Sequence, residues 1–131
     1  MSWKMYSSLF LFALFAGCSP VNVNDYIKDQ WQLAMPFPLD SKNVVKRTSD
    51  YIVIKVSPQQ KEQFHTLPIE TFGYTPWKKL TDMGLNIYGF NIAGNYLFCE
   101  TLSPERCQIK KIFINQDKDE IIFVNINYSG Y

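Results

Sequence analysis

The chain has 131 residues, of which 47% are hydrophobic, with 13 basic and 12 acidic side chains and one histidine. Only Lys4 is charged among the first 17 positions, so the remaining 114 residues (131 less 17) carry 12 basic and 12 acidic side chains. This length suffices for one domain with its own apolar core. The balanced charge excludes the basic surface by which proteins hold nucleic acid, and no basic run is present that would grip anionic lipid heads.

The first residues have the pattern of an export signal. One positive charge at Lys4 precedes an unbroken apolar run, Leu9–Phe15, which ends in the small residues Ala16 and Gly17. This order of charge, short apolar stretch and small residues is typical of a secretory signal peptide. The run is too short to span a bilayer, which takes about 20 apolar residues. We therefore predict that residues 1–17 are cleaved off, and they are left out of the fold prediction.

The end of this signal, Phe15-Ala-Gly-Cys18, resembles the lipobox of bacterial lipoproteins, in which small residues precede an invariable cysteine. The resemblance implies that Cys18 becomes a lipidated N-terminus and a permanent membrane anchor, because such a cysteine carries several acyl chains. Phe15 departs from the usual leucine, and ordinary secretion or an uncleaved segment are the alternatives. Ser19 resembles the pattern of sorting to the outer membrane, facing the periplasm. Residues 18–24 are then lipidated N-terminus and tether, and 25–131 a single domain.

The first predicted element of the domain is a helix over Asp25–Met35, because large apolar residues recur there at every fourth position. Asn24 is its predicted N-cap, and the prolines at 36 and 38 end it. Tyr51–Val56 is rich in β-branched residues and predicts a strand.

Two helix starts follow that strand. Ser57-Pro58-Gln59-Gln60 combines a serine cap, a proline at the first helical position and a glutamine three residues after the serine. We predict a helix from there to about Thr66. Thr75-Pro76-Trp77 repeats this chemistry and predicts a further helix to Met83, since Gly84 is a helix-stop residue.

The rest of the chain predicts strands separated by turn-rich segments. The predicted strands are Leu85–Ile92, Tyr96–Leu102, Gln108–Ile114 and Glu120–Tyr128. The segments between them are Ala93–Asn95, Ser103–Arg106 and Asn115–Asp119. In the last strand, Ile122, Val124, Ile126 and Tyr128 share one face, with Asn125 and Asn127 on the other. Together these elements predict an α+β fold: an antiparallel sheet of four or five strands with two or three short helices packed on one face.

With Cys18 assigned to lipid, Cys99 and Cys107 remain in the domain. In an oxidising compartment such a pair is normally bridged. Pairing the strands around Pro104 places the two cysteines across neighbouring antiparallel strands, within disulfide range. We therefore predict a Cys99–Cys107 disulfide, with two buried thiols or a metal site as the alternatives. A metal site lacks further ligands, so we expect no metal and no cofactor.

Two further stretches are similar to segments of small uncharacterised bacterial lipoproteins. They are the apolar, proline-containing run Pro36–Val44 and the strand with its Ser-Pro helix start, Tyr51–Pro58, followed by a short helix to Phe64. The resemblance covers about a third of the chain. It implies the same location in the cell, the envelope, and it implies no activity.

Three groups of residues suggest chemistry, and each has a plainer explanation. His65 lacks a recognisable nucleophile and orienting partner, and at a helix end it meets the negative end of the dipole. Glu100 and Glu105 form an acid and base pair only if their environments separate their pKa values; acidic turn residues are otherwise common.

Asn115, Asp117 and Asp119 alternate like the opening of a calcium loop. Such a loop needs glycine where Glu120 stands and an acid where Ile126 stands. We therefore interpret the segment as a hairpin turn.

The segment Phe72–Trp77 combines aromatic residues with glycine and proline. Phe72, Tyr74 and Trp77 are candidates for contact with a partner protein, since aromatic anchors dominate such contacts. The alternative is that they fill the core beneath a loop. A second candidate surface is the C-terminal set of asparagines and tyrosines, Asn125, Asn127, Tyr128 and Tyr131, although an ordinary exposed sheet face explains that set as well.

These observations favour binding over catalysis. The leading prediction is a lipid-anchored envelope protein, non-enzymatic, that binds another envelope protein as an accessory component. The alternatives are a periplasmic immunity protein or enzyme inhibitor and, third, an envelope hydrolase. The predicted partners are the membrane, through the N-terminal lipid, and a protein; nucleic acid is excluded by the charge balance.

Overall fold

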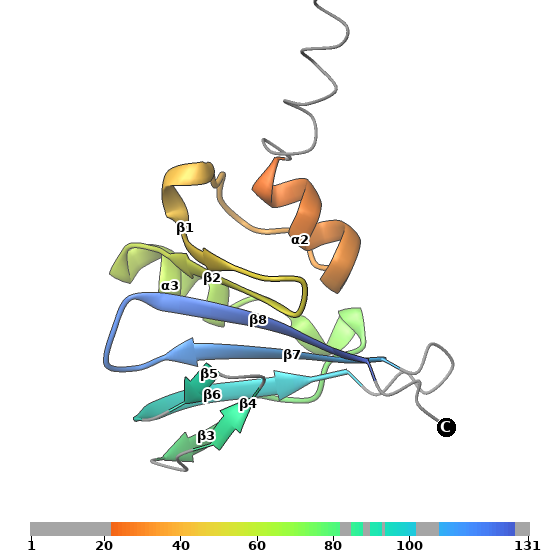
Figure 1. The fold of residues 1–131 in the computed structure, drawn as a ribbon, viewed down its shortest axis with the longest axis vertical. Coiled ribbons are helices and arrows are strands. Elements are labelled where there is room, and N and C mark those ends of the chain that lie inside the picture. Colours follow the sequence, from red (N-terminus) through yellow and green to blue (C-terminus); the bar gives the residue numbers. More distant parts are fainter. Residues whose placement is uncertain (1–21, 82–84, 88–89, 93, 102–107, 128–131) are drawn as a thin grey trace, which may run out of the picture.

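The computed structural model describes residues 22–81, 85–87, 90–92, 94–101 and 108–127 (Figure 1). In 85–87 and 90–92 it describes the backbone alone. The predicted signal peptide, Cys18, Cys107, Tyr128 and Tyr131 lie outside the described residues. Within the described part, no helix is both long and apolar enough to cross a membrane.

Six strands form one open antiparallel sheet in the order β1-β2-β8-β7-β6-β3, and β4 and β5 form a separate hairpin (Figure 1). The strands are β1 (Val44–Arg47), β2 (Tyr51–Lys55), β3 (Lys78–Thr81), β4 (Leu85–Ile87), β5 (Phe90–Ile92), β6 (Asn95–Glu100), β7 (Gln108–Asn115) and β8 (Glu120–Asn127). The helices are α2 (Val23–Trp31) and α3 (Pro58–His65), with 3₁₀ turns η1 (Ser41–Asn43) and η2 (Ile69–Phe72). The predicted α+β class with an antiparallel sheet is confirmed. The predicted number of strands in the sheet is wrong.

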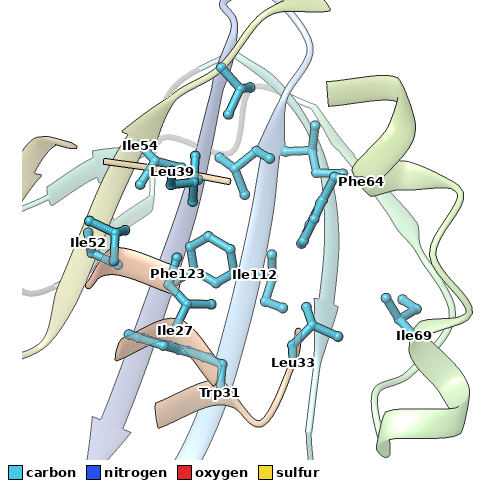
Figure 2. Packing of buried hydrophobic residues seen from close by; sticks show 14 of the residues in the cluster. Ile27, Trp31, Leu33, Leu39, Ile52, Ile54, Phe64, Ile69, Ile112 and Phe123 are labelled. Atoms are coloured by element: carbon cyan, nitrogen blue, oxygen red, sulfur yellow. The ribbon is translucent and has the colours of Figure 1, made fainter. Parts of the chain in front are cut away.

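Both α-helices cover the same face of the sheet and share one core with it. Phe123 of β8 lies near the middle of this core, with its ring centroid 5.5 Å from that of Trp31 in α2 and 5.8 Å from that of Phe64 in α3 (Figure 2). The opposite face also buries side chains, in a smaller cluster of Tyr51, Val53, Tyr96, Phe113, Ile122 and Val124. Because both faces are buried, the central strands have continuous apolar sequences.

Helix α2 begins and ends earlier than the predicted Asp25–Met35. Its N-cap is Asn22, whose side chain accepts from the backbone N–H of Asn24 and of Asp25. The helix ends at Trp31 because Gln32 adopts a left-handed conformation, with φ 53°. Asn24, the predicted cap, instead holds the following proline-rich bridge: its side chain donates to the carbonyl of Phe37 and accepts from the N–H of Leu39.

The predicted strand and helix start around residue 57 are confirmed as β2 and α3. The Ser57 hydroxyl accepts from the Gln60 N–H at 3.1 Å, and the Gln60 side chain accepts from the Ser57 N–H at 3.0 Å. This reciprocal capping box satisfies two backbone donors at the helix start.

The helix predicted after Thr75-Pro76 is wrong, because this segment leads into the edge strand β3. β3 pairs with β6 from Lys78↔Phe98 to Thr81↔Asn95. Proline at a helix start and proline in an edge strand or bulge are both tolerated, so the local sequence does not separate the two. The added strand is one reason that the sheet exceeds the predicted number.

The single strand predicted over Leu85–Ile92 is also wrong. Two short strands, β4 and β5, pair with each other, from Leu85↔Ile92 to Ile87↔Phe90. Tyr88-Gly89 stands between them in the sequence, which is the length of a tight hairpin connection. The strands predicted further on match β6, β7 and β8 closely.

The predicted opposition of Cys99 and Cys107 across two strands is wrong in its register. Cys99 lies on β6 opposite Ile112 of β7. It is fully buried on the helix-covered face and has no disulfide partner among the described residues. Cys107 falls outside the described residues, so the disulfide itself stays a prediction.

Candidate functional site

The aromatic segment Phe72–Trp77 does not form one exposed surface. Tyr74 is buried, and its hydroxyl donates to the carbonyl of Trp31 at 2.6 Å, which ties this segment to the end of α2. Trp77 is half-buried, with its ring against those of Phe64 and His65. Phe72 alone is largely exposed, at 42%. Of the three predicted partner contacts, the structure places Tyr74 in the core and Phe72 on the surface.

A bulge before β3 explains why Tyr74 and Trp77 both point under the helices. Three residues apart on a regular strand, they would point to opposite faces. Tyr74 pairs with Thr101, and Lys78 pairs with Phe98, so three residues on this side oppose only two on β6. The extra residue reverses the alternation, and both rings pack against the helix-covered core.

Two ionisable groups in the core next to this segment are held in their neutral forms. Burial raises the pKa of the Tyr74 hydroxyl well above its ordinary value, and the neighbouring Cys99 adds to the shift. Burial likewise raises the pKa of the Cys99 thiol, with Glu100 as the second cause. A thiol held protonated is a poor nucleophile, so this geometry favours packing roles for both.

His65 is the last residue of α3, as predicted, and its ring centroid lies 5.8 Å from that of Trp77. Two buried polar atoms have no hydrogen-bond partner within the part of the chain that is described: the indole N–H of Trp77 and the side-chain oxygen of Asn125. Asn125 is only 8% exposed, which corrects its predicted place on a polar outer face, whereas Asn127 is exposed.

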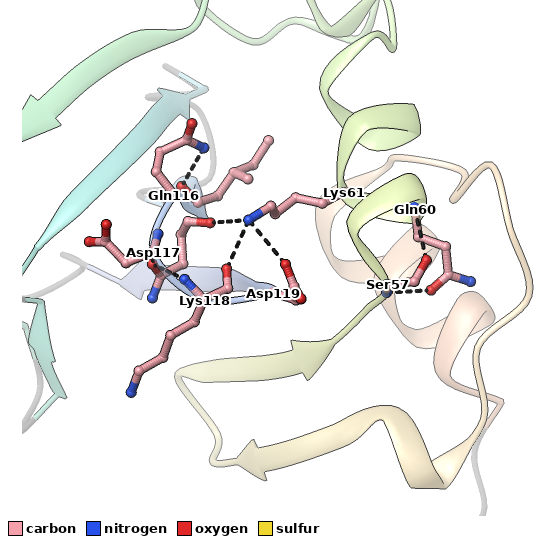
Figure 3. A network of polar contacts seen from close by, with 9 residues as sticks. Ser57, Gln60, Lys61, Gln116, Asp117, Lys118 and Asp119 are labelled. Atoms are coloured by element: carbon pink, nitrogen blue, oxygen red, sulfur yellow. Dashed lines mark hydrogen bonds and ion pairs between the residues drawn. The ribbon is translucent and has the colours of Figure 1, made fainter.

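The β7–β8 turn, considered above as a calcium loop, is built around a lysine. The ammonium group of Lys61 from α3 donates to the carbonyls of Asn115 and Lys118, each at 3.0 Å, and lies 3.3 Å from a carboxylate oxygen of Asp119 (Figure 3). The Asn115 side chain accepts from the N–H groups of Asp117 and Lys118, which closes the turn. Of the three side chains considered as calcium ligands, Asp119 thus pairs with the ammonium group, and Asn115 and Asp117 accept from backbone N–H groups.

Of the other two acidic candidates, the structure describes Glu100. Glu100 forms an ion pair with Lys111, with 3.6 Å between the nitrogen and oxygen atoms. Glu105 lies outside the described residues. Among the described residues, no group of three or more histidine, cysteine or acidic side chains has the spacing to hold a metal ion.

The two edge strands of the sheet differ in backbone regularity and in the contacts of their charged side chains. At β1 the register shifts across Val45, which bulges out and is 54% exposed. The charges beside it rest on aromatic rings: Lys46 Nζ lies 5.8 Å from the ring centroid of Tyr51, and Arg47 Cζ lies 4.0 Å from that of Tyr26. Bulges and basic side chains are common means of keeping further strands off an edge.

At the other edge, β3 keeps an unbroken register over its four residues. Lys78, Lys79 and Thr81 are exposed, and Leu80 packs against the smaller cluster. Neither lysine takes part in an ion pair or a cation–ring contact with another described residue. The β3 edge, defined here by Lys78–Thr81, is therefore a regular strand edge that carries two lysines without an acidic partner among the described residues.

Comparison with family models, with curated proteins and with solved structures finds no match to this chain.

The sequence predicts a helix at Lys78 and Lys79 and therefore does not predict the β3 edge. The adjacent lysines after Pro76 are the only signal that pointed to it. Two lysines in a row give charge to both faces of a strand, since side chains alternate, and edge strands favour that pattern.

Proposed function

We propose that this protein is a bacterial lipoprotein of the cell envelope, anchored through Cys18, that binds another envelope protein as a non-enzymatic accessory component. The observation that carries the proposal is the position of Cys18. It follows the apolar run and the small residues Ala16 and Gly17 directly. It also stands just five residues before the first residue of α2, Val23.

This short spacing supports a domain held close to its membrane. Five residues of extended chain reach about 17 Å at most. An anchor at Cys18 therefore brings the start of α2 to the membrane surface. In the sheet, β3 is the strand furthest from β1, and α2 lies toward the β1 side (Figure 1). The β3 edge therefore lies on the side of the sheet away from the start of α2 and from the proposed anchor.

Two surface features support a protein partner. Phe72 exposes a large apolar side chain at the end of η2, and the β3 edge exposes a regular strand. Exposed aromatic rings and open strand edges are both common elements of protein recognition.

The anchor is tested by replacing Cys18→Ala in the full chain and measuring lipid labelling and membrane fractionation. We expect loss of acyl labelling and release from the membrane. A variant that remains membrane-bound to the same extent would contradict the anchor.

The partner is tested by pulling down the full chain, tagged at its C-terminus, from envelopes solubilised in mild detergent. Co-purifying envelope components identified by mass spectrometry would support the accessory role. A single stoichiometric enzyme, inhibited on binding, would replace that role with an inhibitor or immunity function. Absence of any co-purifying protein would contradict both.

A further inference from the structure

At two residues of β3 the backbone hydrogen-bonding groups point away from β6 and have no partner in the part of the chain that the structure describes. Gln116 donates to the carbonyl of Asn95 at 2.8 Å, so the backbone groups of Asn95 point toward β7. In an antiparallel pair these directions alternate along the strand. Because Thr81 lies opposite Asn95, the amide and carbonyl of Thr81, and likewise those of Lys79, point away from β6. They form the outermost row of the sheet.

The charges on this edge point to both faces. Lys78 lies opposite Phe98, which belongs with the smaller cluster, and Lys79 lies opposite Leu97, which packs against the helix-covered core. An added strand can pair with both lysines only if it carries two adjacent acidic residues, one on each face of the sheet. At the far end of the edge, Asp117 is already engaged, because its carboxylate accepts from the N–H of Asn95.

We infer that the β3 edge is the docking surface for an extended, acidic segment of a protein partner. This segment pairs with β3 as a seventh strand and places two adjacent acidic residues opposite Lys78 and Lys79. The inference rests on the proposed function, which supplies the partner, and it names the chemistry by which that partner is recognised.

Charge decides between the possible occupants of this edge. Lysines on an edge strand hinder indiscriminate pairing, because a neutral strand leaves both of them uncompensated. A second copy of β3 would place like charges near each other across the new pair, which is unfavourable. An acidic strand turns the same two charges into favourable contacts and gains selectivity from them.

The position of the edge fits this role. Six strands at about 4.8 Å spacing put β3 roughly 24 Å from β1, with α2 toward the β1 side (Figure 1). An anchor before α2 leaves the β3 edge accessible from the compartment, whereas the β1 edge is bulged and nearer to the membrane.

The test uses a display library of random ten-residue peptides, selected on the full chain in mild detergent. We expect the selected peptides to be enriched in adjacent acidic residues within β-branched sequence. Binding should slow hydrogen exchange at the amides of Lys79 and Thr81, and should leave the amides of β1 unchanged. Selected peptides without acidic enrichment, protection at another surface, or no selected peptide at all would each overturn the inference.

Matched variants separate charge from backbone pairing. Lys78→Glu/Lys79→Glu should weaken peptide binding by about tenfold or more, whereas Lys42→Glu/Lys55→Glu makes the same charge change at exposed sites outside β3 and should alter it less than about twofold. Thr81→Pro removes an outward N–H and should also weaken binding, while Thr81→Val keeps that N–H and should not. Equal effects within either pair of variants would overturn strand addition at β3.

The two proposals fail separately. If acidic peptides bind β3 but envelope pull-downs yield no protein, the accessory function fails and the docking chemistry stands. If an envelope protein co-purifies and its binding is unchanged by Lys78→Glu/Lys79→Glu, the docking surface is wrong and the accessory function stands.

Discussion

The two α-helices lie on the same face of the sheet but are attached to it by different means. α2 buries three apolar side chains, Val23, Ile27 and Trp31, and the Trp31 indole N–H donates to the carbonyl of Val124 at 3.0 Å. α3 buries only Phe64. Its further contact with the sheet is polar, through the Lys61 ammonium group, which binds the β7–β8 turn, while the capping box stabilises its own first turn (Figure 3).

This difference shows how a small domain fixes a helix that lacks an apolar stripe. Burial of large apolar side chains contributes to the free energy of folding without depending on charge screening by salt. A partly exposed ammonium group contributes through direct hydrogen bonds and through a charge pair that salt screens. Substitutions in α2 should therefore act through packing, and those in α3 through polar contacts.

The largest effect is expected at the apolar helix. Trp31→Ala removes a buried indole that packs on Phe123 and Tyr26, and it should lower the free energy of unfolding by about 3–5 kcal/mol. Urea denaturation followed by circular dichroism measures this loss. A loss smaller than that of Lys61→Met would reverse the proposed ranking of the two helices.

Lys61→Met tests the polar contacts between α3 and the β7–β8 turn. It removes three contacts to the β7–β8 turn and should cost about 1–3 kcal/mol, toward the lower end because Asp119 is 42% exposed on its side chain. The difference from the unchanged chain should shrink when NaCl is raised. Lys118→Met is the matched control, since that residue contributes its carbonyl rather than its side chain to the network; it should alter stability by less than about 0.5 kcal/mol.

Tyr74→Phe tests the bond at the end of α2 and should cost about 1–2 kcal/mol, because the Trp31 carbonyl loses its buried donor. It also has a pH signature. Since burial raises the pKa of Tyr74 above its ordinary 10.0, the folded state holds this proton more tightly than the unfolded state. The resulting stability is complete below pH 10 and is lost as pH rises above 10.

Comparing the alkaline unfolding of Tyr74→Phe with that of the unchanged chain measures this contribution, because Cys99 is present in both. The variant should lose stability less steeply above pH 10. Identical alkaline slopes would contradict a buried, neutral Tyr74.

The smallest effect is expected at the helix starts. Ser57→Ala and Asn22→Ala each remove one N-cap and should cost about 1 kcal/mol. Because α3 has fewer buried contacts with the sheet than α2, the same loss is a larger fraction of the free energy that keeps α3 folded. Amide exchange should therefore show α3 opening more readily in Ser57→Ala than α2 does in Asn22→Ala. Equal opening of both helices would mean that their attachments are equivalent.

Local chemistry made some elements predictable. The capping box depends on Ser57 and Gln60, which are three positions apart, so it can be recognised in the sequence. The strands β2, β7 and β8 can be recognised from their runs of β-branched residues. The face predicted for the last strand is confirmed for Ile122, Val124 and Ile126, and Tyr128 lies outside the described residues.

Pairing between distant segments decided the rest. The segment after Pro76 is a strand because β6 offers it an edge, and the bulge that turns Trp77 inward exists only in that pairing. The contact of Lys61 with Asn115 and Lys118 joins parts of the chain that are 54 and 57 residues apart. The β3 edge could not be predicted for the same reason, since an edge is defined by the order of strands.

The place of β8 in the sheet has a consequence for when this protein can fold. β8 is the last of the described strands along the chain, yet it lies between β2 and β7. Until it emerges, the N-terminal unit of α2, β1, β2 and α3 has no strand that joins it to β6 and β7. In a chain that crosses a membrane unfolded, this strand order would delay assembly of the sheet until β8 has emerged.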